Sequence, residues 1–146
     1  MSRVQLALNV SNLDEAIEFY SKFFKTKPAK VRNGYANFAI DEPPLKLVLM
    51  ENEGVPGSLN HLGVEVFSTG DVIAASEYLS SVGMATRAEE STTCCFAVQD
   101  KVWVDGVDGS PWEVYTVLED STASNGIKGD GSCCVPSETN ATSACC

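Results

Sequence analysis

An internal repeat is the feature that most limits how this chain can fold. The segment VQLALNV at residues 4–10 aligns with NHLGVEV at residues 60–66, at a constant offset of 56 residues. Both segments alternate with a period of two, as the side chains of a half-buried β-strand do. The 146-residue chain is therefore expected to hold two copies of one module, each beginning with a strand.

Each of these strands is followed by a signal for the start of a helix. Residues 11–14 (SNLD) lead into a predicted helix at 15–24, and residues 68–71 (STGD) lead into a predicted helix at 72–82. Apolar side chains of the first helix share one broad face, which we expect to be buried.

Three short strands are expected after each helix. In the first module they are residues 28–32, 34–40 and 45–51, with Asn33-Gly34 as a tight hairpin turn. In the second module they are residues 84–89, 93–99 and 101–104, the last continuing after a turn at 105–110 into 111–118. The repeat returns at the end of each module, where PLKLVL aligns with PWEVYT at an offset of 67 residues.

Two βαβββ modules, an α+β fold class, are the simplest description of this pattern. The modules would be residues 1–51 and 60–118, joined by a linker at 52–59. From residue 119 onward large apolar residues are almost absent, so this segment cannot bury enough surface to offset its ordering entropy. We expect a folded domain at 1–118 and a disordered tail at 119–146.

The charge of the chain excludes some classes of partner. The net charge is −10, and the 10 Lys and Arg residues are scattered rather than clustered. This argues against nucleic acid or an anionic membrane as a partner. No segment approaches the run of about 20 apolar residues that a membrane span needs. The N-terminus lacks the pattern of a secretory signal, so we expect a soluble, cytosolic protein.

The repeat also predicts a site. If the modules pair about a pseudo-twofold axis, four equivalent positions face one cavity, namely Gln5, Lys46, His61 and Glu113. Three of these side chains can bind a metal ion, and His61 is the only histidine in the chain. A single histidine on a strand is more often a structural residue than a ligand. The repeat-equivalent placement favours the metal site, and strand alternation places Glu65 on the same face as His61.

Six cysteines occur as three adjacent pairs, Cys94-Cys95, Cys133-Cys134 and Cys145-Cys146. The cytosol keeps thiols reduced, and paired thiolates suit soft ions. In a regular strand adjacent side chains point to opposite faces, so Cys94 and Cys95 can chelate one atom only from a loop or bulge. The alternative role for this pair is that of two small core residues.

Several segments together are similar to one known family. GYANFAI, DEPPLKLVL, LNHLGVEV, TTCCFAVQDKVWV and PWEVYTVLEDS resemble the bacterial carbon–arsenic lyases of arsenic-resistance operons, whose near relatives are cadmium-induced proteins. That family belongs to the vicinal oxygen chelate superfamily, with glyoxalase I, extradiol dioxygenases and bleomycin-resistance proteins. The resemblance covers residues 1–120 and implies that the two modules form a shared open barrel.

The resemblance implies an Fe(II) site and identifies its ligands. In the family a Gln, a His and a Glu hold the metal, and the matching residues here are Gln5, His61 and Glu113. Three protein ligands leave positions for water, O2 and substrate. Lys46, at the fourth equivalent position, cannot bind a metal while protonated, which favours an oxygenase over an isomerase. Other divalent ions remain open as occupants of the site.

The reaction implied by the family is the cleavage of a carbon–arsenic bond. Cys94 and Cys95 would capture a trivalent organoarsenical, such as methylarsenite or an aromatic arsenical, and its cleavage with O2 would release arsenite. Formaldehyde is the carbon product in the methyl case. Lys101 would orient an oxygen species or close a loop, with a solvated charge as the alternative. Tyr35 and Tyr115 are expected in the pocket wall.

Other interpretations stay open at this stage. The tail pairs at Cys133-Cys134 and Cys145-Cys146 would raise the local concentration of metalloid, bind metal unproductively or have no measurable role. A non-catalytic protein that sequesters Cd(II) or arsenicals fits the cysteine pairs, but it does not explain the Gln, His and Glu. An isomerase or a glutathione-dependent transferase of the same fold is disfavoured by Lys46. Whether the modules pair within one chain or between the chains of a homodimer is also open.

Overall fold

Each half of the chain folds as one strand, one helix and three further strands, as the repeat predicts. The computed structural model describes residues 2–94, 96–107 and 109–121. The first module consists of β1 (Arg3–Val10), α1 (Leu13–Phe23), β2 (Lys30–Arg32), β3 (Tyr35–Ile40) and β4 (Leu45–Glu51). The second module consists of β5 (Leu59–Glu65), α2 (Thr69–Ser81), β6 (Thr86–Cys94), β7 (Ala97–Asp105) and β8 (Pro111–Asp120).

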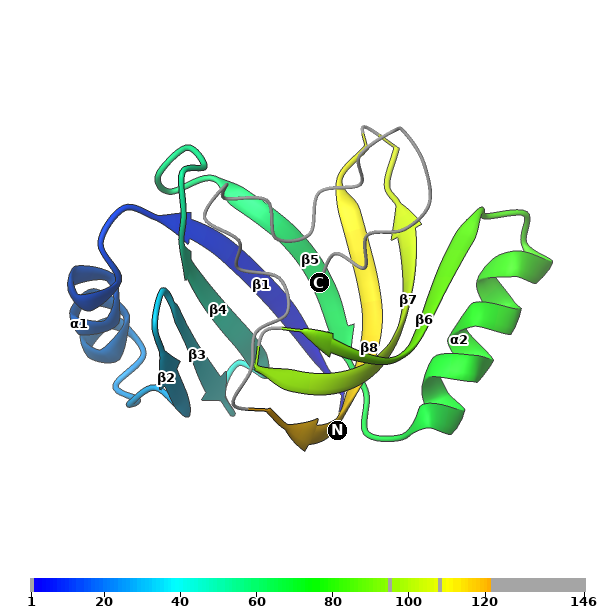
Figure 1. Cartoon of the computed structure of the whole chain (residues 1–146), viewed down its shortest axis with the longest axis horizontal. Helices are drawn as coiled ribbons and strands as arrows, with labels where there is room; N and C mark the ends of the chain where they lie inside the picture. Colours follow the sequence, from blue (N-terminus) through cyan, green and yellow to red (C-terminus); the bar gives the residue numbers. More distant parts are fainter. Residues whose placement is uncertain (1, 95, 108, 122–146) are drawn as a thin grey trace.

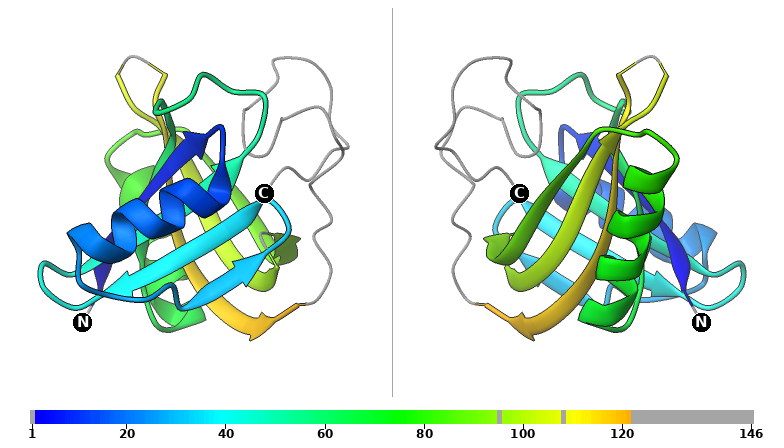
Figure 2. Two further views of the ribbon diagram at one scale, coloured as in Figure 1. Left: turned by 90° about the vertical axis from the view of Figure 1, so that its left-hand side faces the viewer. Right: turned by 90° about the vertical axis from the view of Figure 1, so that its right-hand side faces the viewer.

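All the strands join in one curled sheet with the order β2-β3-β4-β1-β5-β8-β7-β6. The two modules meet where β1 pairs with β5 in antiparallel orientation, and each of these strands has the last strand of its own module as a parallel neighbour. The helices lie at opposite ends of the molecule, each against the outer face of its module (Figures 1 and 2). The expected α+β fold of two βαβββ modules is confirmed, and the modules pair within one chain.

The helices begin where the sequence signals predicted. The side chain of Asn12 accepts a hydrogen bond from the backbone N–H of Glu15, and the side chain of Ser68 accepts one from Asp71. These N-cap bonds satisfy backbone donors that have no partner within the helix. Helix α1 and helix α2 therefore start a few residues before the predicted bounds.

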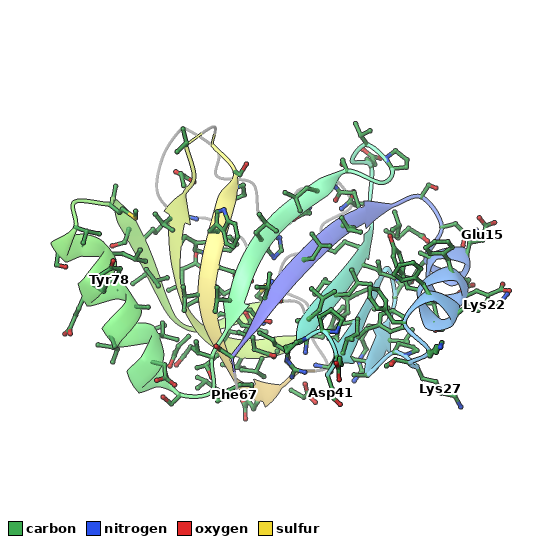
Figure 3. The ribbon with its side chains drawn as sticks, turned by 180° about the vertical axis from the view of Figure 1, so that it is seen from behind. Glu15, Lys22, Lys27, Asp41, Phe67 and Tyr78 are labelled. Carbon is green, nitrogen blue, oxygen red and sulfur yellow. The ribbon has the colours of Figure 1, made fainter. Side chains whose placement is uncertain are left out.

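The larger apolar core lies under α1. Six side chains from α1, β3 and β4 pack together with 7% exposure or less: Leu13, Ala36, Phe38, Ile40, Leu47 and Leu49. On the opposite face of α1, Glu15 and Lys22 point away from the sheet (Figure 3). Phe19 and Phe23 are 58% and 67% exposed, so the expectation that the whole apolar face of this helix is buried was wrong for these two rings. Helix α2 buries only Val72, and its Tyr78 is largely exposed. Neither helix of the described chain is long and apolar enough to cross a membrane.

In the second module the strands predicted at 60–66 and 111–118 correspond to β5 and β8, but the predicted bounds between residues 84 and 104 were wrong. The polar residues around Ser91, expected as a loop, lie inside β6 as a β-bulge, where the pairing register with β7 shifts between Glu89 and Thr92. The backbone of Ser91 has a φ of 48°, and its N–H donates to Asp100 Oδ1 at 2.8 Å. A hydrogen bond from a distant side chain thus lets the strand continue through a polar stretch.

β6 ends at Cys94 and β7 begins at Ala97, both inside the predicted strand 93–99. Phe96 adopts a φ of 62° without being glycine or asparagine. Its carbonyl oxygen accepts hydrogen bonds from the Ser121 N–H at 2.8 Å and from Lys30 Nζ at 3.2 Å. Because both donors come from distant parts of the chain, no local turn signal marks this position. We call residues 94–96 the thiol turn.

The folded part also extends slightly beyond the predicted domain end at residue 118, because β8 continues to Asp120. The tail pairs Cys133-Cys134 and Cys145-Cys146 lie outside the described residues, as does Cys95 of the thiol turn.

Candidate metal centre

The strand register aligns the predicted ligands across the concave face of the sheet. Lys46, Gln5, Gly63 and Glu113 are consecutive cross-strand neighbours on β4, β1, β5 and β8. Directly paired residues point to the same face of a sheet, and residues two apart on one strand do as well. His61, two residues before Gly63, therefore faces the same side as the other predicted ligands.

The register departs from the repeat in one respect. Gln5 pairs with Lys46 in the first module, whereas in the second module Glu113 pairs with Gly63 and not with His61. Because the pairing is shifted by two residues, the Glu113 side chain still points to the concave face of the sheet. It lies opposite Gly63 on β5, two residues beyond His61. It thereby faces Gln5 across a glycine. A Cβ atom on Gly63 would lie 3.0 Å from Glu113 Cγ and 3.3 Å from Gln5 Cβ, so the glycine leaves these two side chains room to meet.

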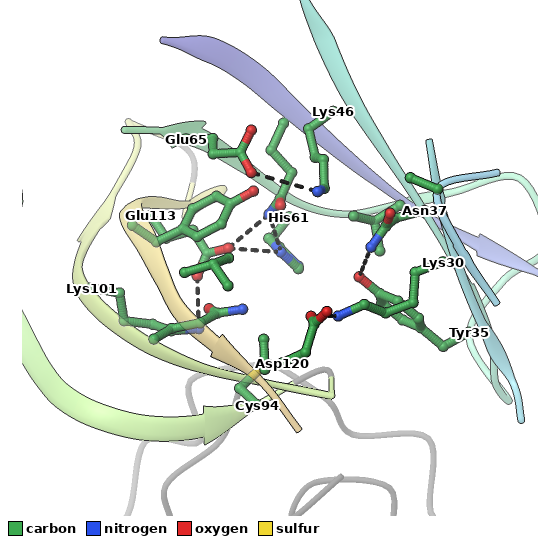
Figure 4. Close-up of a pocket in the computed structure, with 17 residues that line it drawn as sticks. Lys30, Tyr35, Asn37, Lys46, His61, Glu65, Cys94, Lys101, Glu113 and Asp120 are labelled. Atoms are coloured by element: carbon green, nitrogen blue, oxygen red, sulfur yellow. Dashed lines mark hydrogen bonds and ion pairs between the residues drawn. The ribbon is translucent and has the colours of Figure 1, made fainter. Parts of the chain in front are cut away.

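The three predicted ligands converge on one point. Figure 4 shows His61 and Glu113 directed toward one another, and the distances place Gln5 beside them. Gln5 Nε2 lies 3.0 Å from His61 Nε2 and donates to Glu113 Oε1 at 2.7 Å, and His61 Nε2 lies 3.4 Å from Glu113 Oε1. All three residues are at most 5% exposed. Adjacent ligands of an ion with bonds of about 2.1 Å are separated by about 3 Å, so this spacing fits a metal ion.

Two points complete the fit of the residues to a metal. The Gln5 amide presents its nitrogen to the other two side chains, and a half-turn of the amide would bring its oxygen, the atom that binds metals, to the same place. No group of three or more His, Cys, Asp or Glu suited to a metal occurs in the described part of the chain. A metal centre here therefore depends on Gln5 as the third ligand.

Lys101 is buried against the same centre. Its Nζ donates to Glu113 Oε2 at 3.0 Å, and the residue is 1% exposed. The alternative of a solvated charge is therefore wrong. Burial raises the pKa of Glu113, but the nearby Lys101 charge and the His61 hydrogen bond outweigh it and lower that pKa to about 2. Glu113 is thus an anion, with Oε2 held by Lys101 and Oε1 directed at Gln5 and His61.

Lys46 lines the cavity without joining this convergence. Its Nζ lies 3.5 Å from Glu65 Oε1, and Arg3 pairs with the other oxygen of the same carboxylate. Burial lowers the pKa of Lys46, while the charge of Glu65 raises it. Glu65 lies on the His61 face, as strand alternation predicted, although it was not among the predicted site residues. Lys46 is thus directed at a carboxylate (Figure 4).

The thiol turn closes the open side of the curled sheet. Cys94 is 1% exposed and belongs to an apolar cluster with Tyr35 of the first module, whose ring centroid lies 5.6 Å from that of Phe96. Lys30, on β2, pairs with Asp120 and donates to the Phe96 carbonyl. Cys94 is the last residue of β6 and lines the same cavity as the predicted metal ligands. Its burial also fits the alternative role as a core residue.

One cavity of about 270 Å³ collects the predicted site residues. Its walls include Gln5, Tyr35, Lys46, His61, Cys94, Lys101, Glu113 and Tyr115. Burial and the nearby carboxylates Glu65 and Glu113 raise the pKa of Tyr115 well above its usual value, so its side chain stays a phenol.

Sequence reasoning missed other polar residues in the cavity wall. Asn37 and Gln99 line it, each at most 7% exposed. Asn37 Oδ1, Gln99 Oε1 and the Tyr115 hydroxyl have no hydrogen-bond partner among the described residues. Their capacity to bond is available to a ligand. Strand alternation could have found Asn37, because it lies two residues after the predicted pocket residue Tyr35 on β3 and so shares its face.

Comparison with known proteins agrees with this architecture. The family model of the Glyoxalase/Bleomycin resistance protein/Dioxygenase superfamily matches residues 3–114. A trivalent organoarsenical cleaving enzyme of Thermomonospora curvata is 56% identical over 146 residues, covering 99% of this chain and 95% of that protein. The cadmium-induced protein CadI of Mycobacterium tuberculosis is 63% identical over 121 residues, covering 83% of this chain and 80% of that protein.

Among solved structures, the Mn(II)-bound glyoxalase of Novosphingobium aromaticivorans has the same fold. It aligns with a TM-score of 0.59 at 18% identity, over 83% of this chain and 42% of that chain. The double βαβββ sheet with a polar site on its concave face thus defines the class of protein. The chain belongs to the Glyoxalase/Bleomycin resistance protein/Dioxygenase superfamily.

Proposed function

We propose that the protein is a non-heme Fe(II) lyase that uses O2 to cleave the carbon–arsenic bond of trivalent organoarsenicals, releasing arsenite. The observation that carries this proposal is the convergence of Gln5, His61 and Glu113 in a cavity that Cys94 also lines. The name of the relative from Thermomonospora curvata, a trivalent organoarsenical cleaving enzyme, supports it.

Gln5, His61 and Glu113 would hold the metal ion. Fe(II) bound by three protein ligands supplies open coordination positions and the ability to activate O2. Lys101 keeps one oxygen of Glu113 occupied, so the carboxylate offers the centre its other oxygen. The pairing of Lys46 with Glu65 turns the fourth repeat-equivalent side chain to another partner, which supports an oxygenase rather than a four-ligand isomerase.

The thiol turn would hold the arsenic. Trivalent arsenic prefers soft thiolate ligands, and Cys94 with Cys95 would supply two of them. The organic group would then lie in the cavity between the thiol turn and the metal ligands. Tyr35 and Val48 provide apolar surface there, and the Tyr115 hydroxyl provides a hydrogen-bond donor. Holding both reactants in one buried cavity would raise their effective concentration.

The proposed reaction balances without an external reductant. For methylarsenite it is CH3As(OH)2 + O2 → As(OH)3 + HCHO. The As–C bond breaks, one oxygen atom of O2 ends on arsenic in arsenite, and the other ends on carbon in formaldehyde. The methyl carbon is oxidised and O2 is fully reduced, so no electrons need to come from elsewhere.

One experiment tests this proposal directly. Protein loaded with Fe(II) under anaerobic conditions is mixed with methylarsenite and then exposed to air, and arsenite and formaldehyde are measured. We expect equal amounts of the two products and no reaction without O2. Failure to form either product with iron bound and O2 present would sink the lyase proposal.

A second candidate function is the sequestration of Cd(II) or arsenicals without catalysis. The name of the 63% identical relative, a cadmium-induced protein, favours it. Stoichiometric arsenical binding that survives loss of His61 but yields no product in the wild-type protein would support this function instead. In either case the partners are small molecules, and we expect the protein to act in the cytosol.

A further inference from the structure

The two nitrogens of the His61 imidazole have different neighbours. Nε2 faces the proposed metal site, and Nδ1 faces the side chain of Asn60. Nδ1 lies 2.7 Å from Asn60 Oδ1, and Nε2 lies 3.4 Å from Glu113 Oε1. A neutral imidazole has one proton, and the nitrogen without it carries the lone pair that binds metal. With the proton on Nε2, the ring would donate to Glu113 and lose its capacity as a ligand. The tautomer of His61 therefore decides whether the centre can form.

We propose that three asparagines, Asn52, Asn9 and Asn60, hold His61 in the tautomer that can bind metal. We call them the asparagine relay. Each amide has one donor end and one acceptor end, so an orientation imposed on one amide passes to the next. The inference rests on the proposed metal site, but not on the carbon–arsenic chemistry.

One end of the relay is oriented by a backbone donor. Asn52 Oδ1 accepts the N–H of Gly54 at 2.7 Å, in the linker between the modules. A backbone N–H can only donate, so the oxygen of Asn52 must face it and the nitrogen must face away. That nitrogen donates to Asn9 Oδ1 at 2.8 Å.

A second backbone group orients the relay in the same sense. Ser58 Oγ donates its single proton to the carbonyl of Val55 at 2.5 Å, so toward Asn9 it can only accept. Asn9 Nδ2 donates to it at 2.9 Å. Two independent contacts therefore point Asn9 Oδ1 toward Asn52 and Asn60.

The orientation then reaches the histidine. Asn60 Nδ2 donates to Asn9 Oδ1 at 2.9 Å, which leaves Asn60 Oδ1 facing His61 Nδ1. An oxygen acceptor at that position requires a proton on Nδ1, so Nε2 keeps its lone pair. Gln5 Nε2 supports the same tautomer from the other side at 3.0 Å. That support ends when the Gln5 amide turns its oxygen to a metal, and the asparagine relay then acts alone.

The packing around the relay leaves it little freedom. Asn9 is 7% exposed, and its backbone pairs with Ser58 and Gly57 of the linker. A Cβ atom on Gly54 would lie 2.7 Å from Asn52 Oδ1 and 2.9 Å from Asn9 Cγ, so only glycine fits there. The linker is thus pressed against the relay that it orients.

The tautomer can be measured directly because His61 is the only histidine in the chain. We would record the ring ¹⁵N signals of the full, metal-free chain by NMR, at a pH where the imidazole is neutral. We expect Nδ1 to be the protonated nitrogen. Asn9→Ala leaves Asn60 in place but free to turn, and Asn60→Ala removes the acceptor. Both should shift the ring toward the Nε2-protonated form, which a histidine free in water favours.

Two further variants separate the relay from general damage to the fold. Asn9→Asp retains an acceptor for Asn60 and should restore the Nδ1-protonated form. Asn12→Ala removes the N-cap of α1 without touching the relay, and should leave the ring signals unchanged. Anaerobic Fe(II) titration should show that Asn9→Ala and Asn60→Ala each weaken binding about 10- to 100-fold.

Several results would overturn the inference. One is a wild-type His61 protonated on Nε2, and another is an unchanged tautomer in Asn60→Ala, which would make Gln5 sufficient. A shifted tautomer with unchanged Fe(II) affinity would also count against it. If Asn9→Ala does not fold, the tautomers measured in the wild-type protein and in Asn60→Ala still test the inference. A failure to cleave organoarsenicals would leave the ring signals as they are, so the two proposals fail separately.

Discussion

The two modules share one layout but contribute unequally to the site. In the first module the larger apolar core lies under α1, and the β2–β3 hairpin has strands of 3 and 6 residues. In the second module β6 and β7 have 9 residues each, and their hairpin carries Cys94 across to the first module. The first module thus supplies most of the packed platform, while the second supplies His61, Glu113 and Lys101. The repeat thus builds the sheet, and residues that differ between the two modules supply most of the candidate site.

The strongest test of this asymmetry changes one inward-facing residue of each module. We expect His61→Ala to abolish Fe(II) binding and turnover, because the imidazole is a proposed metal ligand. Arsenical binding should persist, because the proposed arsenic ligands are thiols and not His61. Lys46→Met, on the first module, should leave Fe(II) affinity unchanged because Lys46 pairs with Glu65. Anaerobic Fe(II) titration measures both, and equal losses would contradict the asymmetry.

The ion pair of the second module should matter more for stability than the exposed pair on α1. Lys101→Met leaves the buried Glu113 carboxylate without its cation, which should lower the free energy of unfolding of the metal-free protein by about 3–5 kcal/mol. Lys22→Met breaks the exposed pair with Glu18, where water screens both charges, so the free energy of unfolding should scarcely change. Urea unfolding measures both. A loss for Lys101→Met as small as that for Lys22→Met would refute the structural role of the buried pair.

A glycine where the two modules meet gives the next largest effect. Gly63→Ala places a methyl group 3.0 Å from Glu113 Cγ, so the two ligands flanking it must move apart, and Fe(II) affinity should fall about 10- to 100-fold. Gly70→Ala in α2 meets nothing closer than 3.6 Å and should stabilise the helix by about 0.5–1 kcal/mol. Isothermal titration with Fe(II) should show weaker binding in Gly63→Ala and unchanged binding in Gly70→Ala. Unchanged affinity in Gly63→Ala would show that Glu113 does not need the space beside Gly63.

The smallest effect is expected where the first module holds the thiol turn. Lys30→Met removes the bonds to Asp120 and to the Phe96 carbonyl, so arsenical affinity should fall a few-fold while Fe(II) affinity is unchanged. Because Asp120 is mostly exposed, the loss of its ion pair should lower the free energy of unfolding by about 1 kcal/mol or less. Lys22→Met, which breaks the exposed pair with Glu18 on α1, is the control. A parallel loss of Fe(II) affinity would show that the turn and the metal ligands are one unit.

Much of the fold could be predicted because the repeat and the strand alternation are local patterns. They placed β1 and β5, both helices, and the four inward positions that include Gln5 and His61. They did not reveal that Glu113 pairs with Gly63, because register depends on how strands from distant segments dock. Nor did they reveal the turn at Phe96, whose unusual backbone is held by Ser121 and Lys30 rather than by a turn residue.

The partners of the site residues were the least predictable part. Asn9 and Asn60 read in the sequence as ordinary polar positions at strand ends. Their significance depends on backbone groups of the linker, which are distant from Asn9 in the sequence. Side chains that act through another side chain leave no spacing signal of their own.

The proposed ligands lie on both sides of the seam between the modules, and this has a practical consequence. Gln5 comes from one module, and His61 and Glu113 come from the other, across the pairing of β1 with β5. Neither half can assemble the full set by itself. The iron content of a preparation would therefore report the fraction of molecules whose two modules are correctly paired. Bound metal would also stabilise the pairing of β1 with β5 by its binding free energy.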